Sequence, residues 1–221
     1  MKEGWRRLRW VLIYGIFYMI SFYLIENRTV RIHIIHTKFD KMIPFCEYFI
    51  IPYLLWFLFV AVTVLYFAFF NKSRQEYYSL VTNLGIGMTI FIVISWIYPN
   101  GHILRPIILG DSIFDRAVRA LHEMDTPTNI FPSIHVFNSL ACCIALMKND
   151  RCRRHKILSC NIVILTILII MSTVLLKQHS VLDIIGAFAM CLIIYPFVYP
   201  KDTSVSVKER HTRSHKELRE I

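Results

Sequence analysis

Long apolar runs constrain the fold of this chain more than any other feature of its sequence. Six windows of about 16 to 22 residues are almost free of charge, and each is long enough to cross roughly 30 Å of hydrocarbon as a helix. These windows are residues 10–25, 49–70, 78–98, 131–147, 157–176 and 180–199. Because 56% of the 221 residues are hydrophobic, too little polar sequence remains to wrap six such helices in water. The sequence therefore predicts an all-α polytopic membrane protein, a six-transmembrane helix bundle.

The distribution of Lys and Arg predicts the orientation of this bundle. Of the 25 Lys and Arg residues, 17 lie in the amino terminus, the 71–77 turn, the 148–156 turn and the tail. The other eight lie in the 26–48 loop, the 99–130 loop and the 177–179 turn. The positive-inside rule places the first group, with both termini, in the cytoplasm, and the second group outside.

The domain organisation follows from the same pattern, since no internal repeat or low-complexity linker divides the chain. One membrane domain is expected over residues 1–221, with the first two transmembrane helices in 1–77 and the chemistry in 78–200. Residues 201–221 form an expected charged cytoplasmic tail near anionic lipid headgroups. The excess behind the net charge of +10 is confined to the cytoplasmic turns and tail, which favours the lipid bilayer as partner and disfavours nucleic acid.

The cysteines do not indicate a metal site. The six cysteines show no C-x-x-C or His-plus-Cys spacing and only Cys46 is expected outside, so they are predicted to be small apolar core residues without disulfides.

In the outer 99–130 loop, Ser112 and Asp115 have the spacing of a capping box. A short amphipathic helix on the outer interface is expected there, with one face made of Ile113, Ala117, Leu121 and Met124.

Two short strings place a histidine at the edge of an apolar run, where ionisable groups are costly. The first is Phe131-Pro132-Ser133-Ile134-His135. Pro132 suits the first turn of a helix, so the N–H groups of Ser133, Ile134 and His135 are expected to be free to bind an anion, beside the Ser133 hydroxyl.

The second string is Lys177-Gln178-His179-Ser180-Val181-Leu182-Asp183. His179 and Asp183 are four residues apart, which predicts that they share one helical face and that the carboxylate orients the imidazole ring. Ser172 and Arg105 are expected on the same outer side. Taken singly, these residues suit interfacial anchors, helix caps or packing hydroxyls; together at one membrane face they favour a phosphoryl-transfer site.

These strings resemble the three motifs of the type-2 phosphatidic acid phosphatase and haloperoxidase superfamily, K-x6-R-P, P-S-G-H and S-R-x5-H-x3-D. The matching residues are Arg105-Pro106, then Pro132-Ser133-Ile134-His135, then Ser172 with His179 and Asp183, over about residues 98–190. The resemblance implies three catalytic residues: His179 attacks phosphorus, Asp183 holds its ring and His135 protonates the leaving oxygen. It further implies that Arg105, Ser133, Ser172 and Lys177 bind the substrate phosphate, without metal or other cofactor.

The chain departs from these motifs at three positions. Tyr98 stands where the family has its lysine, Ile134 replaces the glycine, and Thr173 replaces the arginine. Two phosphate-binding cations are therefore missing, and Lys177 is a better candidate than His102 to replace them because it precedes His179 by two residues.

The resemblance implies a membrane phosphatase with its active site on the extracytoplasmic face. Its substrate would be a lipid phosphate or pyrophosphate, such as phosphatidate, phosphatidylglycerophosphate or a polyprenyl pyrophosphate, and the intermediate a phosphohistidine. The P-S-I-H and H-x3-D pair without the arginine also resembles the inositolphosphorylceramide and sphingomyelin synthase branch. A phospho-headgroup transferase is therefore a second candidate function. A non-catalytic lipid-binding relative stays open too. A carrier is less consistent, since the second and fifth spans show little Gly or Pro interruption.

Overall fold

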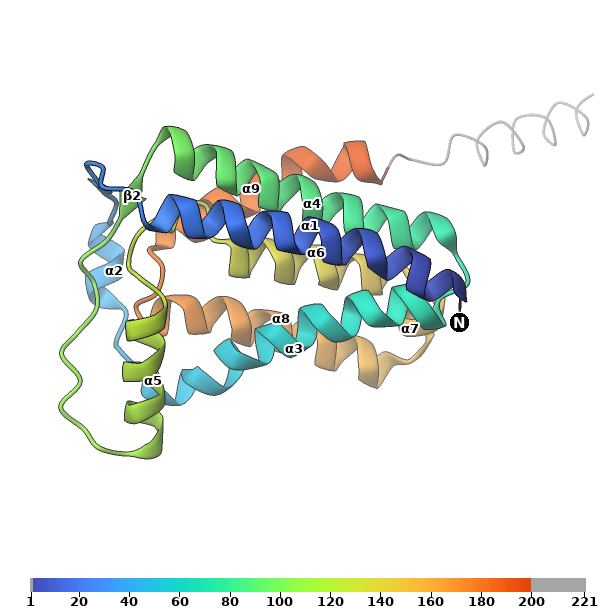
Figure 1. The fold of residues 1–221 in the computed structure, drawn as a ribbon. Helices are drawn as coiled ribbons and strands as arrows, with labels where there is room; N and C mark the ends of the chain where they lie inside the picture. The colour runs from blue at the N-terminus through green and yellow to red at the C-terminus, as the bar shows by residue number, and fades with distance from the viewer. Residues whose placement is uncertain (1, 200–221) are drawn as a thin grey trace, which may run out of the picture.

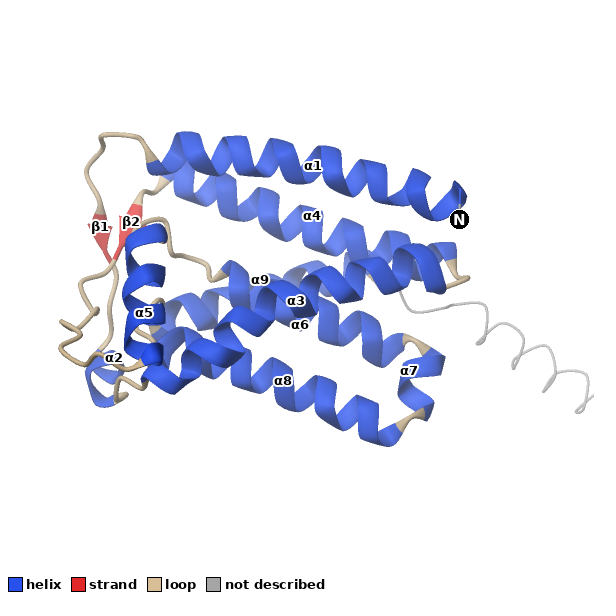
Figure 2. Ribbon diagram, turned by 60° about the horizontal axis from the view of Figure 1, so that its bottom comes forward, coloured by secondary structure: helices blue, strands red, loops and turns tan. Residues whose placement is uncertain are grey.

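The computed structural model describes residues 2–199, and helices dominate it (Figures 1 and 2). Each of the six predicted apolar runs is helical, which confirms the all-α polytopic bundle. The bundle helices are α1 (Lys2–Glu26), α3 (Ile50–Leu65), α4 (Arg74–Ile97), α6 (Ile134–Lys148), α8 (Lys156–Leu175) and α9 (Val181–Val198). A 3₁₀ turn, η1 (Glu47–Phe49), precedes α3, and a π-helical turn, η2 (Tyr66–Phe70), extends it. The predicted tail 201–221 lies outside the described residues.

Five of these segments are long and apolar enough to cross a membrane, counting η1, α3 and η2 as one. The first begins at Lys2 rather than at residue 10, because its charged first turns continue the helix. Arg7 is buried there, and its guanidinium donates to the carbonyl oxygens of Phe67 and Asn71.

The two ends of the described chain lie at the same end of the bundle (Figure 1). Tyr77 near the start of α4 donates to the Arg7 carbonyl oxygen, and Ser79 donates to that of Val198. This arrangement agrees with an even number of crossings. The cytoplasmic location of the two termini stays a prediction.

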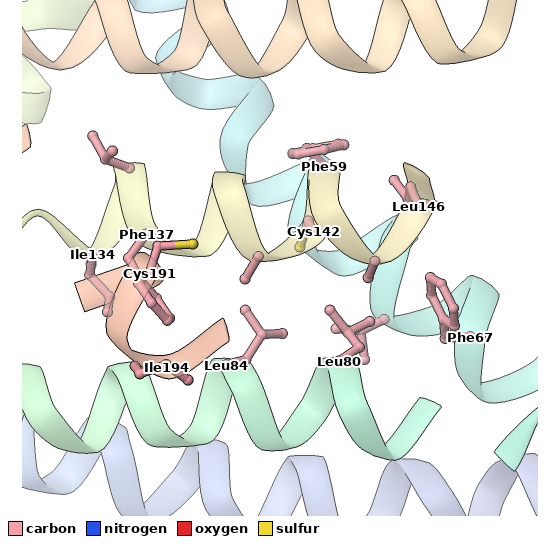
Figure 3. Close-up of a cluster of buried hydrophobic side chains, with 14 of the residues drawn as sticks. Phe59, Phe67, Leu80, Leu84, Ile134, Phe137, Cys142, Leu146, Cys191 and Ile194 are labelled. Carbon is pink, nitrogen blue, oxygen red and sulfur yellow. The ribbon is translucent and has the colours of Figure 1, made fainter. Parts of the chain in front are cut away.

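Helix α6 is the shortest of the six and is enclosed by α3, α4, α8 and α9. Its side chains form the centre of the hydrophobic core with those of α3, α4 and α9 (Figure 3). At Gly87 of α4 the two helices come so close that a Cβ atom would lie 1.9 Å from Phe137 of α6. With 15 residues, α6 rises about 22 Å, less than the roughly 30 Å of hydrocarbon, and the helices around it shield this shorter helix from lipid.

Short elements cover one end of the bundle. They are β1 (His33–Ile34), which pairs in parallel with β2 (Asn100–Gly101), and the helices α2 (Lys38–Met42) and α5 (Ile113–Met124). A further helix, α7 (Asp150–Arg154), joins α6 to α8 at the opposite end.

The amphipathic helix is confirmed as α5, with Ser112 and Asp115 forming its capping box. Its buried face is partly different from the one predicted, since Val118 and Leu121 are buried but Ile113 and Met124 are exposed. The reason is that α5 crosses the end of the bundle and packs against η1 and α3, which select the Val118 side.

All six cysteines are free, as the spacing predicts. Cys142, Cys152 and Cys191 are buried, whereas Cys160 is exposed, so the core assignment holds for only part of the set.

Candidate active site

Three side chains form a hydrogen-bonded row where α6 and α9 begin. The Nδ1 atom of His179 lies 3.3 Å from Oδ2 of Asp183, and its Nε2 atom lies 3.3 Å from Nδ1 of His135. A carboxylate accepts a hydrogen bond from the Nδ1–H group, so the lone pair of the His179 ring is on Nε2. The row therefore contains an oriented imidazole with a second histidine at its reactive nitrogen.

The pairing of His179 with Asp183 arises from a helix cap rather than from one helical face. Helix α9 begins at Val181, so His179 lies in the preceding turn. Ser180 is the N-cap, and its backbone N–H donates to Asp183 Oδ2 at 2.8 Å. The capping box thus fixes the same carboxylate that holds the imidazole ring.

The start of α6 differs from the prediction in one respect. Ser133 is the N-cap and the helix begins at Ile134, so Pro132 precedes the helix instead of opening it. The Ser133 N–H donates to the Asp183 carbonyl oxygen at 3.1 Å, which ties the two helix starts together. The Ser133 amide is therefore not free for an anion, and its buried Oγ accepts from the Val136 N–H at 3.4 Å.

Two aromatic side chains from α3, which sequence reasoning missed, lie against His135. The ring centroid of Trp56 is 4.3 Å from that of His135, and the centroid of Tyr53 is 4.7 Å away. The Tyr53 hydroxyl donates to Oδ2 of Asp125 at 3.2 Å. Burial raises the pKa of Asp125, while His179 and Arg105 act in the opposite direction. Nothing in the sequence marks these aromatic residues among the many in the apolar runs.

Arg105 lies beside this row and is held by two acceptors. Its guanidinium donates to the His122 carbonyl oxygen at 3.0 Å and to the Oε1 atom of Gln178. Gln178 directly precedes His179, and only 2% of its surface is exposed. Sequence reasoning missed this glutamine, although its place beside the histidine was a usable signal.

His102 is not a replacement cation. Its Nδ1 atom accepts from the Leu104 N–H at 3.2 Å, which leaves Nε2 to donate to the Gln178 carbonyl oxygen at 2.9 Å. Burial lowers its pKa to about 4, although the hydrogen bond to Gln178 opposes this. The ring is therefore neutral at neutral pH and positions the backbone of Gln178.

Lys177 is held by a neighbouring helix. Its ammonium donates to the Asp40 carbonyl oxygen at 2.7 Å and to that of Ile43, at the end of α2. The side chain is 8% exposed. These contacts hold the amino group at α2, and the substrate-binding role expected for Lys177 stays a prediction.

The other residues of the third motif are engaged within α8. The buried Ser172 hydroxyl donates to the Ile169 carbonyl oxygen at 2.6 Å. Thr173 donates in the same way to Ile170, and its own carbonyl oxygen accepts the N–H groups of Gln178 and His179. Thr173 thereby shapes the turn that carries His179. Tyr98, in place of the family's lysine, stacks on His33 with ring centroids 4.5 Å apart.

Asp40 fastens α2 to the start of α9. Its carboxylate accepts from the Val181 N–H at 2.8 Å and from the Ser180 hydroxyl at 2.7 Å, and it is 2% exposed. Burial opposes its charge, but the hydrogen bonds from Val181, Thr37 and Ser180 prevail and lower its pKa. With Lys177, this carboxylate forms a reciprocal latch between α2 and the His179 turn.

Asp40→Asn is expected to destabilise the folded protein by about 2 kcal/mol, because an amide cannot accept on both sides. The lowered pKa means that the carboxylate stabilises the fold above the unfolded-state pKa of about 3.9, and that this is lost as the pH falls through the lower folded-state pKa. Thermal unfolding in detergent between pH 3 and pH 7 measures both effects. Equal melting temperatures of the two proteins across this range would contradict the latch.

A comparison with protein-family models finds the PAP2 superfamily over residues 32–197. The chain belongs to the PAP2 superfamily. The match runs from the loop before β1 to the end of α9 and contains Arg105, His135, His179 and Asp183. Searches of curated proteins and of solved structures found no match. The PAP2 superfamily generally comprises phosphatases and phosphotransferases. Membership in it supports a phosphatase-type fold for this chain.

Proposed function

We propose that this PAP2 protein is a membrane phosphatase that hydrolyses a lipid phosphate or pyrophosphate through a phosphohistidine. The observation that carries the proposal is the row of His135, His179 and Asp183, recessed where two apolar helices begin. The reaction needs no metal in this scheme, since the residues supply the nucleophile, the acid and the positive charge.

In the first step, His179 Nε2 attacks phosphorus in line with the leaving oxygen. The N–P bond forms as the P–O bond to the lipid breaks, and a protonated His135 gives its proton to the leaving oxygen. Asp183 holds the Nδ1 proton and stabilises the positive charge on the ring.

In the second step, water hydrolyses the phosphohistidine. His135, now neutral, takes one proton from the water as its oxygen attacks phosphorus and the N–P bond breaks. Inorganic phosphate leaves, His179 regains its lone pair and His135 regains its proton.

Arg105 supplies the cation for the equatorial oxygens, where charge spreads in a loose transition state. Burial lowers the pKa of Arg105, and nearby Asp125 opposes that shift, but the guanidinium stays charged at neutral pH. The N–H groups of Ile134 and His135 in the first turn of α6 add partial positive charge.

The active site is proposed to face the extracytoplasmic side. It lies at the end of the bundle opposite to Arg7, Arg74 and the basic helix α7. The positive-inside rule assigns the basic end to the cytoplasm. A substrate at the other end reaches the histidines from the outer leaflet.

A panel assay on purified protein tests the proposal. Lipid phosphates and pyrophosphates are supplied with and without an acceptor lipid, in the presence of EDTA, and both free phosphate and transferred headgroup are measured. Release of phosphate in EDTA is expected. A strict metal requirement would contradict the scheme.

Headgroup transfer is the second candidate, and the half-buried Asp125 favours it. This carboxylate is joined through Tyr53 to the His135 side of the site, and burial raises its pKa. A carboxylate of raised pKa is suited to take a proton from an acceptor hydroxyl. Transferred headgroup in excess of free phosphate in the panel assay would favour this candidate.

Gln178→Leu is expected to raise KM by about 10- to 100-fold, because Arg105 loses an acceptor worth roughly 1.5 to 3 kcal/mol. Gln178→Glu keeps the acceptor but neutralises Arg105, so it also raises KM, and the increase shrinks as acid protonates the new carboxyl. Initial rates between pH 4 and pH 8 measure KM and kcat separately.

Gln75→Leu is the matched control, since Gln75 is exposed at the opposite end of the bundle. Its KM should equal that of the wild type. A KM for Gln178→Glu that does not change with pH would contradict the coupling of Gln178 to Arg105.

A further inference from the structure

An apolar cavity of about 470 Å³ lies between α1, α3 and α4. Its walls are mainly hydrocarbon, from side chains that include Val11, Val60, Val64, Val81, Leu84 and Met88. Helix α1 packs along α4 (Figure 2) and against η2. On α3, the cavity is lined by Trp56, Val60 and Val64. The volume falls within the range of about 300 to 1,000 Å³ that is usual for ligand sites.

One end of the cavity adjoins the candidate active site. Trp56 forms part of its wall, and the same ring lies 4.3 Å from the ring of His135. Asn138, on the turn of α6 that follows His135, also lines the cavity. A molecule in the cavity therefore lies one side chain away from the acid of the proposed reaction.

Polar side chains line the other end of the cavity. Arg7 and Tyr77 line it, and the Tyr77 hydroxyl donates to the Arg7 carbonyl oxygen at 2.8 Å. Along α4 the wall runs from Tyr77 to Met88, a rise of about 16 Å at 1.5 Å per residue. This length is close to half the hydrocarbon thickness of about 30 Å.

We propose that this cavity binds one hydrocarbon chain of the substrate lipid while the phosphate lies at His135 and His179. The proposal rests on the proposed function and adds to it a chain-binding site that ends at Arg7 and Tyr77. Continuity through Trp56 is the reason to assign the substrate's own chain, since a bilayer lipid elsewhere on the bundle has no such link to His135. The chain aligns phosphorus with His179 and limits the chain length that fits.

Two glycines keep the cavity open. Gly15 of α1 and Gly85 of α4 both line it, and a Cβ atom at either position would meet no atom within 4 Å. At Gly87, two residues further along α4, the Phe137 ring instead occupies the place that a larger side chain would take. Larger side chains at Gly15 and Gly85 therefore fill the cavity without displacing the protein around them.

Gly15→Leu and Gly85→Leu test the chain-binding site, each with long-chain and short-chain lipid phosphates. Both variants should lower kcat/KM for the long chain by about tenfold, because a displaced chain misaligns phosphorus. Both should leave the short-chain value unchanged. Hydrolysis of the short-chain substrate by the wild type tests the proposed function separately.

Ser21→Leu is the control, because Ser21 lines another hollow between α1 and α4, of about 380 Å³, that shares no wall residue with this cavity. It should preserve the chain-length preference. Binding is measured without turnover by quenching of tryptophan fluorescence with a lipid phosphate brominated on its chain, since Trp10 and Trp56 line the cavity.

The glycine variants should weaken this quenching. Unchanged quenching and unchanged chain-length preference in both variants would overturn the proposal. Equal losses for long and short chains in both variants would overturn it as well.

Discussion

His179→Ala loses essentially all turnover, with kcat expected to fall by about 10⁴-fold or more. The reason is that in the proposed mechanism His179 Nε2 forms the bond to phosphorus, and no other described side chain holds a nitrogen in its place between His135 and Asp183. Initial rates with a lipid phosphate in detergent measure the effect. A second readout is the covalent intermediate, trapped by denaturing the protein in alkali, where a phosphohistidine is stable, and detected as acid-labile phosphate on the protein, which the variant should lack.

The control for this experiment is His155→Ala. His155 is exposed between α7 and α8, at the end of the bundle opposite to the site, and should have wild-type activity. Elution of both variants as the wild-type species in size-exclusion chromatography separates lost chemistry from lost folding. Retained turnover in His179→Ala would exclude the phosphohistidine, and an inactive wild type with bound lipid would indicate the non-catalytic relative.

The fold was predictable because its largest signals are local. Each apolar run is long enough that a helix is the only way to satisfy its backbone in hydrocarbon, and each became a helix. The capping box of Ser112 and Asp115 is likewise a local pattern, and α5 begins there. The buried face of α5 was only half predicted, because it depends on contact with η1 and α3, far away in sequence.

The site was predictable in its chemistry and less so in its electrostatics. His135, His179 and Asp183 meet as their spacing suggests, although a helix cap and not a helical face joins the last two. Lys177 was assigned to phosphate by its distance along the chain. Its ammonium instead reaches α2, a contact between residues more than 130 positions apart that no local pattern encodes.

The missing cations of the family motifs acquire a structural explanation from these contacts. Thr173, in the arginine position, uses its carbonyl oxygen to hold the N–H groups of Gln178 and His179. Gln178 in turn accepts from Arg105, so Arg105 is tied to the nucleophile's own turn. One guanidinium held in this way has a fixed position, which is what stabilisation of a transition state requires.

His135→Gln should lower kcat/KM for an alkyl phosphate by about 10² to 10⁴-fold, because the leaving alkoxide then departs without a proton. The loss should be much smaller for an aryl phosphate such as p-nitrophenyl phosphate, whose leaving oxygen is stable as an anion. Measuring kcat/KM for both substrates isolates the acid role, because kcat/KM reports the first step and not the water step in which His135 acts as base. A damaged nucleophile or a disturbed fold slows both substrates alike.

The aromatic contacts of His135 define the control for this role. Trp56→Phe keeps a ring against His135 and leaves the nitrogen atoms of His135 in place, so it should preserve the ratio of the two kcat/KM values even if both change. His33→Gln, an exposed residue stacked on Tyr98, should change neither value. Equal losses for alkyl and aryl substrates in His135→Gln would show that His135 positions His179 through their shared hydrogen bond instead of protonating the leaving group.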